Sequence, residues 1–533
     1  MTRGILALLT VASVSAGPLD AGLAIARSSG PSTATVDIML NRSANWVDAG
    51  MSGGIPSNNT LYTNISAGAS AAIIQAALDA CPSNQYVLLA AGNYNLEDNL
   101  HLRNDGVELR GTTNINGWAI SKLYGSNANY GVIDISSANY PLPPSAGNII
   151  NISNITAGSS SLVCTGTPSA FSVGDVCSLD EIDWGTINAG GGSQARVADR
   201  NHFAMLRITN ITGNTISFQP PLLSDFTHTP QLWKWPTGPK RSGVRDLYIH
   251  DLNDTFYSVN HNVSIGPADE CYVKNVVCTN ISEAGVKVGF CMNFEIRDCF
   301  FSDHISDAAA TYSIWTLYTG GGRIENNIGY NTPCFYGASG QVGGYFGFNF
   351  CTNTPYSDAW WLPEVVMTHG MHNELIIIEN NHITKVALDN IHGTSDKISV
   401  VRNRIPCYDG SEQTDALYNL VQAYNTNAAF FGNVLGTAVI HTGYTNGSTN
   451  MFNLNVTNLP SLKANYNTVT AGVPTEEALS ANQSLSNSYV YLNSARPEHH
   501  VGAWPPFPYD NPTIANSRTN IAAGYRFDVG HWP

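Results

Sequence analysis

The segments Ile296-Arg-Asp298, Ile324-Glu-Asn326, Ile378-Glu-Asn380 and Val401-Arg-Asn403 are copies of one pattern. In this pattern a β-branched or aromatic residue is followed by any residue and then by Asn or Asp. Further copies occur at Ile249-His-Asp251, Val273-Lys-Asn275, Phe348-Asn349 (an imperfect copy) and Phe431-Gly-Asn433. Successive copies are separated by 24, 23, 28, 23, 31, 23 and 30 residues. A unit of about 23 residues with short insertions is typical of a solenoid, and the short strands within each unit predict a parallel β-helix.

The repeated Asn or Asp has a physical role in such a coil. Asn tolerates the left-handed backbone conformation, and its amide can bond backbone groups in a turn. Asn side chains stacked at one corner can also bond one another along the axis. We therefore assign this column, including the acidic Asp251 and Asp298, to structure rather than to catalysis.

The composition excludes several classes of protein. The chain has 533 residues, 12% of them charged, which argues against a disordered or coiled-coil protein and is long enough for a large core. It has 25 Lys and Arg against 40 Asp and Glu, giving a formal net charge of −15. Nucleic acid and anionic membranes both require a basic face, so neither is expected as a partner.

The entry to the repeat carries a family resemblance. A short helix is expected over residues 70–81, followed by Val-Leu-Leu-Ala-Ala-Gly-Asn-Tyr at 87–94 and Val-Glu-Leu-Arg-Gly at 107–111. This order resembles the pectate-lyase-like right-handed parallel β-helices, which include pectate lyases, polygalacturonases, other polysaccharide hydrolases and phage tailspikes. The resemblance covers roughly residues 70–115 and 244–470 and implies an all-β fold that acts on polysaccharides. It does not imply one reaction, because a single fold hosts several chemistries.

The chain divides into five expected parts. Arg3, the apolar run 4–16 and Ala24-Ile25-Ala26 predict a signal peptide over 1–26, and hence secretion to an extracellular or periplasmic location. The other parts are an N-terminal cap with the first coils (27–159), a small inserted β-module (160–235), the main coils (236–470) and a C-terminal capping tail (471–533). Ten Cys permit disulfides without fixing their pairing. The sequence predicts no oligomeric state.

The repeat also predicts which residues face outward. Eleven residues before the repeated position lie Ser264, Lys287, Trp315, Ala338, His369, His392 and Gln422. His369 and His392 share this offset and are each followed by Gly, so they should stack on adjacent coils about 4.8 Å apart. Strand alternation then places a set of apolar residues inward, namely Val286, Val288, Ile314, Ile391 and Val421.

This outward face has the composition of a sugar-binding groove. Aromatic rings pack on the C–H faces of sugars, while amides and imidazoles bond their hydroxyls. The expected substrate-binding residues are Lys287, Trp315, Tyr336, Trp360, Trp361 and Gln422. The alternative is that the aromatic residues only shield the sheet and the coil edge.

Three functions remain open. Hydrolysis of a glycosidic bond needs two carboxyl groups. Glu364 and Asp389 each precede one of the two histidines, and their carboxyl groups are expected about 5–9 Å apart on adjacent coils. Asp307 is a further candidate. We favour this reaction. A lyase is the second reading, with His369 and His392 as base and acid. A glycan-binding solenoid or adhesin without catalysis is the third.

No cofactor is required by any of these readings, and no metal-ligand spacing is present. A local acidic patch, Asp180-Glu181-Ile-Asp183-Trp184, could hold Ca²⁺, which prefers oxygen ligands. A solvated turn is the alternative interpretation of that patch.

Overall fold

The computed structural model describes residues 48–125, 131–137, 146–185, 187, 196–197, 199–236, 238–252, 260–306, 311–354, 365–366, 369–408, 419–437, 441, 443–445, 450–454, 461–463 and 466–467. The predicted signal peptide and capping tail lie outside these residues. So do four predicted site residues, namely Asp307, Trp360, Trp361 and Glu364.

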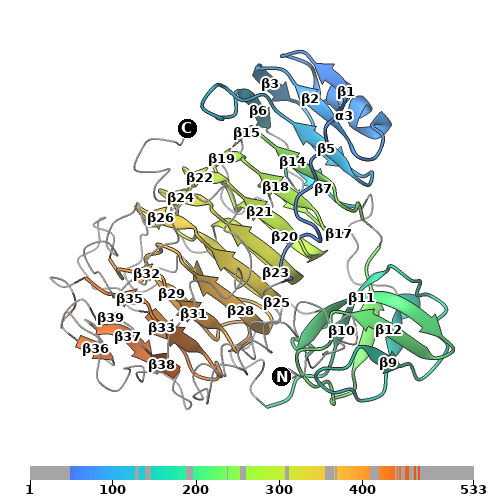
Figure 1. The fold of residues 1–533 in the computed structure, drawn as a ribbon, viewed down its shortest axis with the longest axis vertical. Coiled ribbons are helices and arrows are strands. Elements are labelled where there is room, and N and C mark those ends of the chain that lie inside the picture. Colours follow the sequence, from blue (N-terminus) through green and yellow to red (C-terminus); the bar gives the residue numbers. More distant parts are fainter. Residues whose placement is uncertain are drawn as a thin grey trace, which may run out of the picture.

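The main body is a stack of coils in which each strand pairs in parallel with a strand of the next coil (Figure 1). The described strands of the largest sheet, called here the large sheet, number 23. They are β1 (Thr60–Ile65), β2 (Gln85–Leu89), β4 (Leu100–Leu102), β5 (Val107–Arg110), β7 (Ile133–Ile135), β14 (Gly243–Arg245), β16 (His261–Ile265), β17 (Ala268–Asp269), β18 (Tyr272–Lys274), β20 (Ala284–Met292), β21 (Glu295–Arg297), β23 (Tyr312–Glu325), β25 (Tyr336–Gly347), β27 (Val365–Val366), β28 (Asn373–Glu379), β29 (Val386–Leu388), β30 (Ser395–Asp396), β31 (Ser399–Val401), β33 (Asn419–Val421), β34 (Ala429–Phe431), β36 (Gly443–Thr445), β37 (Asn450–Leu454) and β38 (Ser461–Lys463).

Two smaller parallel sheets complete the described coils. The second sheet contains β3 (Gly92–Leu96), β6 (Ser121–Gly125), β15 (Tyr248–Asp251), β19 (Val277–Thr279), β22 (Phe300–Ser302), β24 (Ile328–Tyr330) and β26 (Phe350–Thr352). The third contains β32 (Arg404–Ile405), β35 (Val434–Leu435) and β39 (Tyr466–Asn467).

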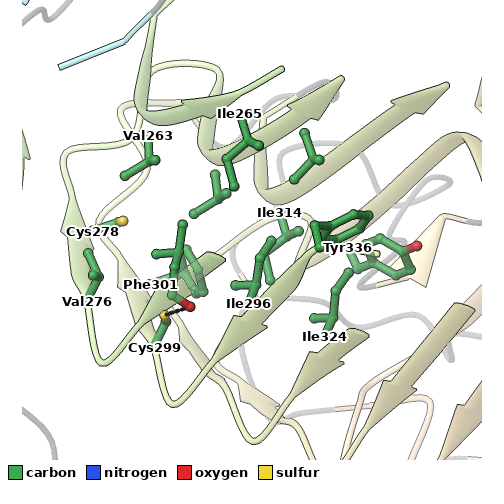
Figure 2. Packing of buried hydrophobic residues seen from close by; sticks show 14 of the residues in the cluster. Val263, Ile265, Val276, Cys278, Ile296, Cys299, Phe301, Ile314, Ile324 and Tyr336 are labelled. Atoms are coloured by element: carbon green, nitrogen blue, oxygen red, sulfur yellow. Dashed lines mark hydrogen bonds between the residues drawn. The ribbon is translucent and has the colours of Figure 1, made fainter. Parts of the chain in front are cut away.

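The core lies inside the coils. Alternate side chains of the large and second sheets point inward and pack on one another, as Figure 2 shows for Ile265, Ile314, Cys278 and Phe301. At the first coil, helix α3 (Ala71–Ala80) buries Ala71, Ile74 and Leu78 against this core. The predicted all-β solenoid with a short N-terminal helix is therefore confirmed.

The Asn pattern divides into two adjacent positions with different roles. One position has a left-handed backbone, with φ of 51° at Asn275, 57° at Asn326 and 58° at Asn380. The following position carries the buried amide ladder, in which the Nδ2 of each Asn donates to the Oδ1 of the next. The ladder runs through Asn327, Asn349, Asn381, Asn403 and Asn433, with spacings of 2.9–3.0 Å.

The sequence pattern does not distinguish these two adjacent positions. It selected Asn326 and Asn380 from the turn but Asn349 and Asn403 from the ladder. Asp251 belongs to neither position, because it ends β15 and accepts the hydroxyl of Ser282 at 2.9 Å. Its expected structural role nevertheless fits this hydrogen bond.

The inserted module is an antiparallel sheet with its own core. Its strands are β8 (Ile149–Asn151), β9 (Ser161–Val163), β10 (Val176–Asp180), β11 (Phe203–Thr212), β12 (Thr215–Gln219) and β13 (Gln231–Lys234), preceded by the 3₁₀ helix η1 (Ala146–Asn148). Because β8 pairs with β13, the module's sheet starts before residue 160. Phe203 and Trp233 of the module pack on Tyr318 and Met371, which anchors it beside β23 and β25 (Figure 1).

The ten cysteines are all buried free thiols. Seven of them belong to the core of the coils, namely Cys81, Cys271, Cys278, Cys291, Cys299, Cys351 and Cys407. Burial raises the pKa of Cys81 and of Cys164 to about 11, so these side chains serve as apolar packing rather than as nucleophiles. No helix within the described ranges is long and apolar enough to cross a membrane.

Candidate active site

Strand pairing places the outward column differently from the sequence register. Lys287 of β20 lies opposite Trp315 of β23, as predicted, but Trp315 lies opposite Gly337 rather than Ala338. Tyr336 lies opposite Ile314 and is fully buried in the core. The prediction that Tyr336 lines the outward face is therefore wrong. The sequence register counts back from the turn residue Asn326 in one coil and from the ladder residue Asn349 in the next, which changes the offset by one residue. A shift of one residue turns a side chain to the other face.

The two histidines lie in turns beyond the ends of the strands rather than on them. Gly337 pairs with Val366 of β27, and Val366 with Ala387 of β29. His369 and His392 therefore follow β27 and β29 in successive coils. Their ring centroids are 4.9 Å apart with an interplanar angle of 80°, an edge-to-face contact. The structure thus brings these two predicted residues together.

Asp389 orients the first of the two histidines. Its Oδ2 lies 3.4 Å from Nδ1 of His369, and its Oδ1 accepts the backbone N–H of Ile391 at 3.2 Å. The Asp389 side chain is fully buried, whereas that of His369 is 23% exposed. Asp389 is thus placed to hold His369 in one orientation, while the imidazole reaches solvent.

His392 has a different electrostatic environment. Burial lowers its pKa, and the charge of His369 lowers it further, while Asp389 acts in the opposite direction. His392 is therefore held in the neutral form at pH 7, in which an imidazole nitrogen can accept a proton.

Gln422 supports the turn that contains Asp389. Its Oε1 accepts the backbone N–H of Asn390 at 3.0 Å, and the side chain of Asn390 donates to the carbonyl of Ala423 at 3.2 Å. Gln422 therefore has a positioning role beside Asp389, and its expected contact with substrate stays a prediction.

Lys287 and Trp315 are linked to the histidines through a residue that the sequence did not single out. The Lys287 ammonium lies 4.3 Å from the ring centroid of Trp315, and Tyr312 stacks on the same ring at 5.5 Å. Trp315 Nε1 donates to Ser339 Oγ at 3.0 Å, and this hydroxyl donates to the carbonyl of His369 at 2.6 Å. The Trp315 ring therefore contacts Lys287 and Tyr312, and the expected contact of Trp315 with a sugar stays a prediction. Ser339 lies in a Gly-rich stretch with no motif that could have identified it.

The inserted module flanks the two turns that carry the histidines. His372, three residues after His369, donates its backbone N–H to the carbonyl of Asn201 at 3.3 Å. Thr394, two residues after His392, donates its hydroxyl to the carbonyl of Ile187 at 3.1 Å. No local sequence pattern indicates this contact, because the module is far from both turns along the chain.

The acidic patch proposed for Ca²⁺ is engaged by protein groups. Asp180 forms ion pairs with Arg196 and Arg200, and Glu181 bonds Nδ1 of His202 at 2.7 Å. The two guanidinium groups place positive charge beside Asp180, which disfavours a cation there. Within the part of the chain that the structure describes, no group of three His, Cys, Asp or Glu side chains is arranged to hold a metal ion.

Comparisons with known proteins give a similarity of fold. No family model and no curated protein matches the sequence. The tailspike gp61 of Pseudomonas phage phi297 matches with a TM-score of 0.50 and 13% identity, over 74% of this chain and 62% of the tailspike. The alginate lyase of Paenibacillus sp. str. FPU-7 matches at 0.38 and 11%, over 74% and 99% of the two chains. The family 28 exopolygalacturonase of Yersinia enterocolitica matches at 0.35 and 11%, over 79% and 78%.

The pairing of the strands and the phi297 tailspike comparison agree with each other and with the sequence pattern. This chain therefore has a parallel β-helix fold, and in this fold it is similar to the phi297 tailspike.

Proposed function

We propose that the protein cleaves a polysaccharide, with His369, Asp389 and His392 as its proton-transfer centre. The observation that carries this proposal is the contact between two imidazoles on successive coils, one of them held by a buried carboxylate. A polysaccharide is the substrate class that the sequence resemblance implies. Secretion, which the first 26 residues predict, fits such a substrate.

β-Elimination is the cleavage reaction that these side chains support best. Neutral His392 would take the proton from the carbon next to a uronate carboxylate, and a double bond forms as the C–O bond to the leaving sugar breaks. His369 would deliver a proton to the departing oxygen. Asp389 fixes the ring of His369 through Nδ1, which leaves Nε2 for that transfer.

Hydrolysis is the second candidate, and the overall charge favours it. A formal net charge of −15 suits a neutral glycan better than a polyuronate. This reaction needs two carboxyl groups at the scissile bond. Asp389 is fully buried and faces His369, so it would have to act through that imidazole. The other predicted carboxyls, Glu364 and Asp307, stay predictions.

A panel of neutral and uronate polysaccharides tests the proposal, with reducing ends and the ultraviolet absorbance of unsaturated uronates followed together. Both signals rise in elimination, and only reducing ends appear in hydrolysis. His369→Gln and His392→Gln should each lower turnover at least about 100-fold, the size of a lost acid–base step. His250→Gln is the matched control, because His250 lies on β15 of the second sheet.

Two results would count against the proposal. Turnover retained in both histidine variants would remove the proton-transfer centre. Binding of a polysaccharide without any cleavage would instead support the glycan-binding solenoid.

A further inference from the structure

The large sheet carries a second polar group on its outward face, three strands away from His369. Glu283 directly precedes β20, and Lys287 lies within it. Val286 and Val288 are fully buried, so alternation turns Lys287 outward. The intervening strands are β23 and β25, followed by β27, which gives a separation of about 14 Å at the spacing of paired strands.

Several polar atoms here lack hydrogen-bond partners. Oε2 of Glu283 is buried without a hydrogen-bond partner, 3.6 Å from Nδ1 of His261, while 15% of the Glu283 side chain stays exposed. That nitrogen is also unpartnered, and the His261 side chain is only 2% exposed. Buried polar groups without partners are rare in folded proteins, so a cluster of them calls for an explanation.

The Lys287 ammonium also lacks a hydrogen-bond acceptor in the described part of the chain. It lies over the ring of Trp315, and no described residue accepts a hydrogen bond from it. Burial lowers the pKa of Lys287 and raises that of Glu283, and in each case the partner's charge acts in the opposite direction. Both groups are therefore partly stripped of water before any ligand arrives, which strengthens a hydrogen bond made there.

We propose that Glu283 and Lys287 bind one uncharged sugar residue of the glycan through two of its hydroxyl groups. One hydroxyl accepts a hydrogen bond from the ammonium of Lys287, and the other donates to the carboxylate of Glu283. A sugar carboxylate would be repelled by Glu283, and a sugar ammonium by Lys287, so an uncharged pair of hydroxyls satisfies both groups.

This subsite rests on the proposed function only in taking the ligand to be a glycan. Its distance from His369 places it a few sugar residues from the bond that is cleaved. It therefore selects for a neutral sugar at that point of the chain, whichever sugar is cleaved.

Binding of the full-length protein to an array of neutral and uronate oligosaccharides tests this subsite without any need for turnover. Lys287→Met keeps the apolar stem on Trp315 and removes the charge, and Glu283→Gln removes the carboxylate. Each should weaken binding to neutral-sugar oligosaccharides at least about tenfold, the loss expected for a hydrogen bond to a charged group. Lys122→Met is the matched control, since the Lys122 ammonium lies 5.1 Å from the ring of Tyr248 on the second sheet.

Thermal melting of each variant separates loss of the subsite from loss of the fold. The subsite is supported when a variant melts at or above the wild-type temperature and loses binding, while Lys122→Met still binds. It is overturned when both variants bind as the wild type does, when the wild type binds uronates alone, or when it binds no sugar. Failure of the cleavage assay beside a positive array result would remove the proposed reaction and leave the subsite in place.

Discussion

The amide ladder gives a sharp test of what holds the coils together. Asn381 is completely buried, and its Nδ2 donates to Oδ1 of Asn403 at 2.9 Å and to the carbonyl of Phe346 at 3.0 Å. Its Oδ1 accepts the backbone N–H of Asn349 at 2.8 Å and the side-chain amide of Asn349 at 3.0 Å. Replacing Asn381 by Ala therefore removes four hydrogen bonds at once.

The cost follows from the groups that are left without partners. Oδ1 of Asn403 keeps the backbone N–H of Asn381 at 2.8 Å, and the side-chain amide of Asn349 keeps the carbonyl of Ile324 at 3.1 Å. The Asn349 N–H and the Phe346 carbonyl lose the bonds that Asn381 gave them. At about 1–3 kcal/mol for each orphaned group, Asn381→Ala should lower the free energy of unfolding by about 2–6 kcal/mol.

Urea unfolding followed by far-ultraviolet circular dichroism measures this loss. The matched control is Asn326→Gly, at a left-handed position with φ of 57°, where Gly has no steric penalty and one hydrogen bond to Asp298 is lost. We expect a change of about 1 kcal/mol or less there. If Asn381→Ala were no more destabilising than Asn326→Gly, the hydrogen bonds between the ladder side chains would not be what stabilises the coils.

Three further predictions concern His392, Ser224 and Glu283. Burial and His369 lower the pKa of His392 below its ordinary value of 6.5, so kcat/KM should stay constant on acidification until the pH is below 6.5. A fall in kcat/KM that begins above pH 6.5 would show that another group is the base. Ser224→Ala removes the hydroxyl that bonds both Glu374 at 2.8 Å and His202 at 3.1 Å, so it should lower the free energy of unfolding by about 1 kcal/mol, whereas exposed Ser161→Ala should leave it unchanged. Since burial raises the pKa of Glu283, its stabilising contribution is complete below the unfolded value of about 4.5 and is lost as the pH rises through the folded value. The free energy of unfolding of Glu283→Gln should therefore exceed that of the wild type by about 1 kcal/mol at pH 7 and equal it at acidic pH. If the variant and the wild type had the same urea midpoint at pH 7 as well, this reasoning would be wrong.

The sequence predicted the coil well where side-chain alternation was regular. Val286, Val288, Ile314 and Val421 all point inward, with exposures of 0–1%. These residues lie on strands, where a period of two fixes the face. The same alternation identified Lys287 and Trp315 as neighbours on one face.

Prediction failed where the repeated Asn was taken from the turn in one coil and from the ladder in the next, and where a coil carries an insertion. Tyr336 moved from the expected outer face to the core, and the histidines moved from a strand to the turns that follow it. The histidine pair was nevertheless found, because His369 and His392 follow the paired residues Val366 and Ala387 of successive coils by three and five residues, and their rings still meet. Ser339 and the module contacts at His372 and Thr394 depend on tertiary packing, so no local pattern could have revealed them.

The Gly that follows His392 has a structural explanation, and it leads to a last prediction. A Cβ added at Gly393 would lie 2.2 Å from the carbonyl oxygen of Gly370, closer than real Cβ atoms approach backbone. Gly393 therefore allows the turn carrying His392 to pack on the turn carrying His369. Gly393→Ala should push these turns apart and lower kcat by at least about tenfold, since acid–base transfer needs close positioning. The matched control is Gly166→Ala in the module, where an added Cβ meets nothing. Wild-type turnover in Gly393→Ala would show that the spacing of 4.9 Å between the two imidazoles is not what the reaction requires.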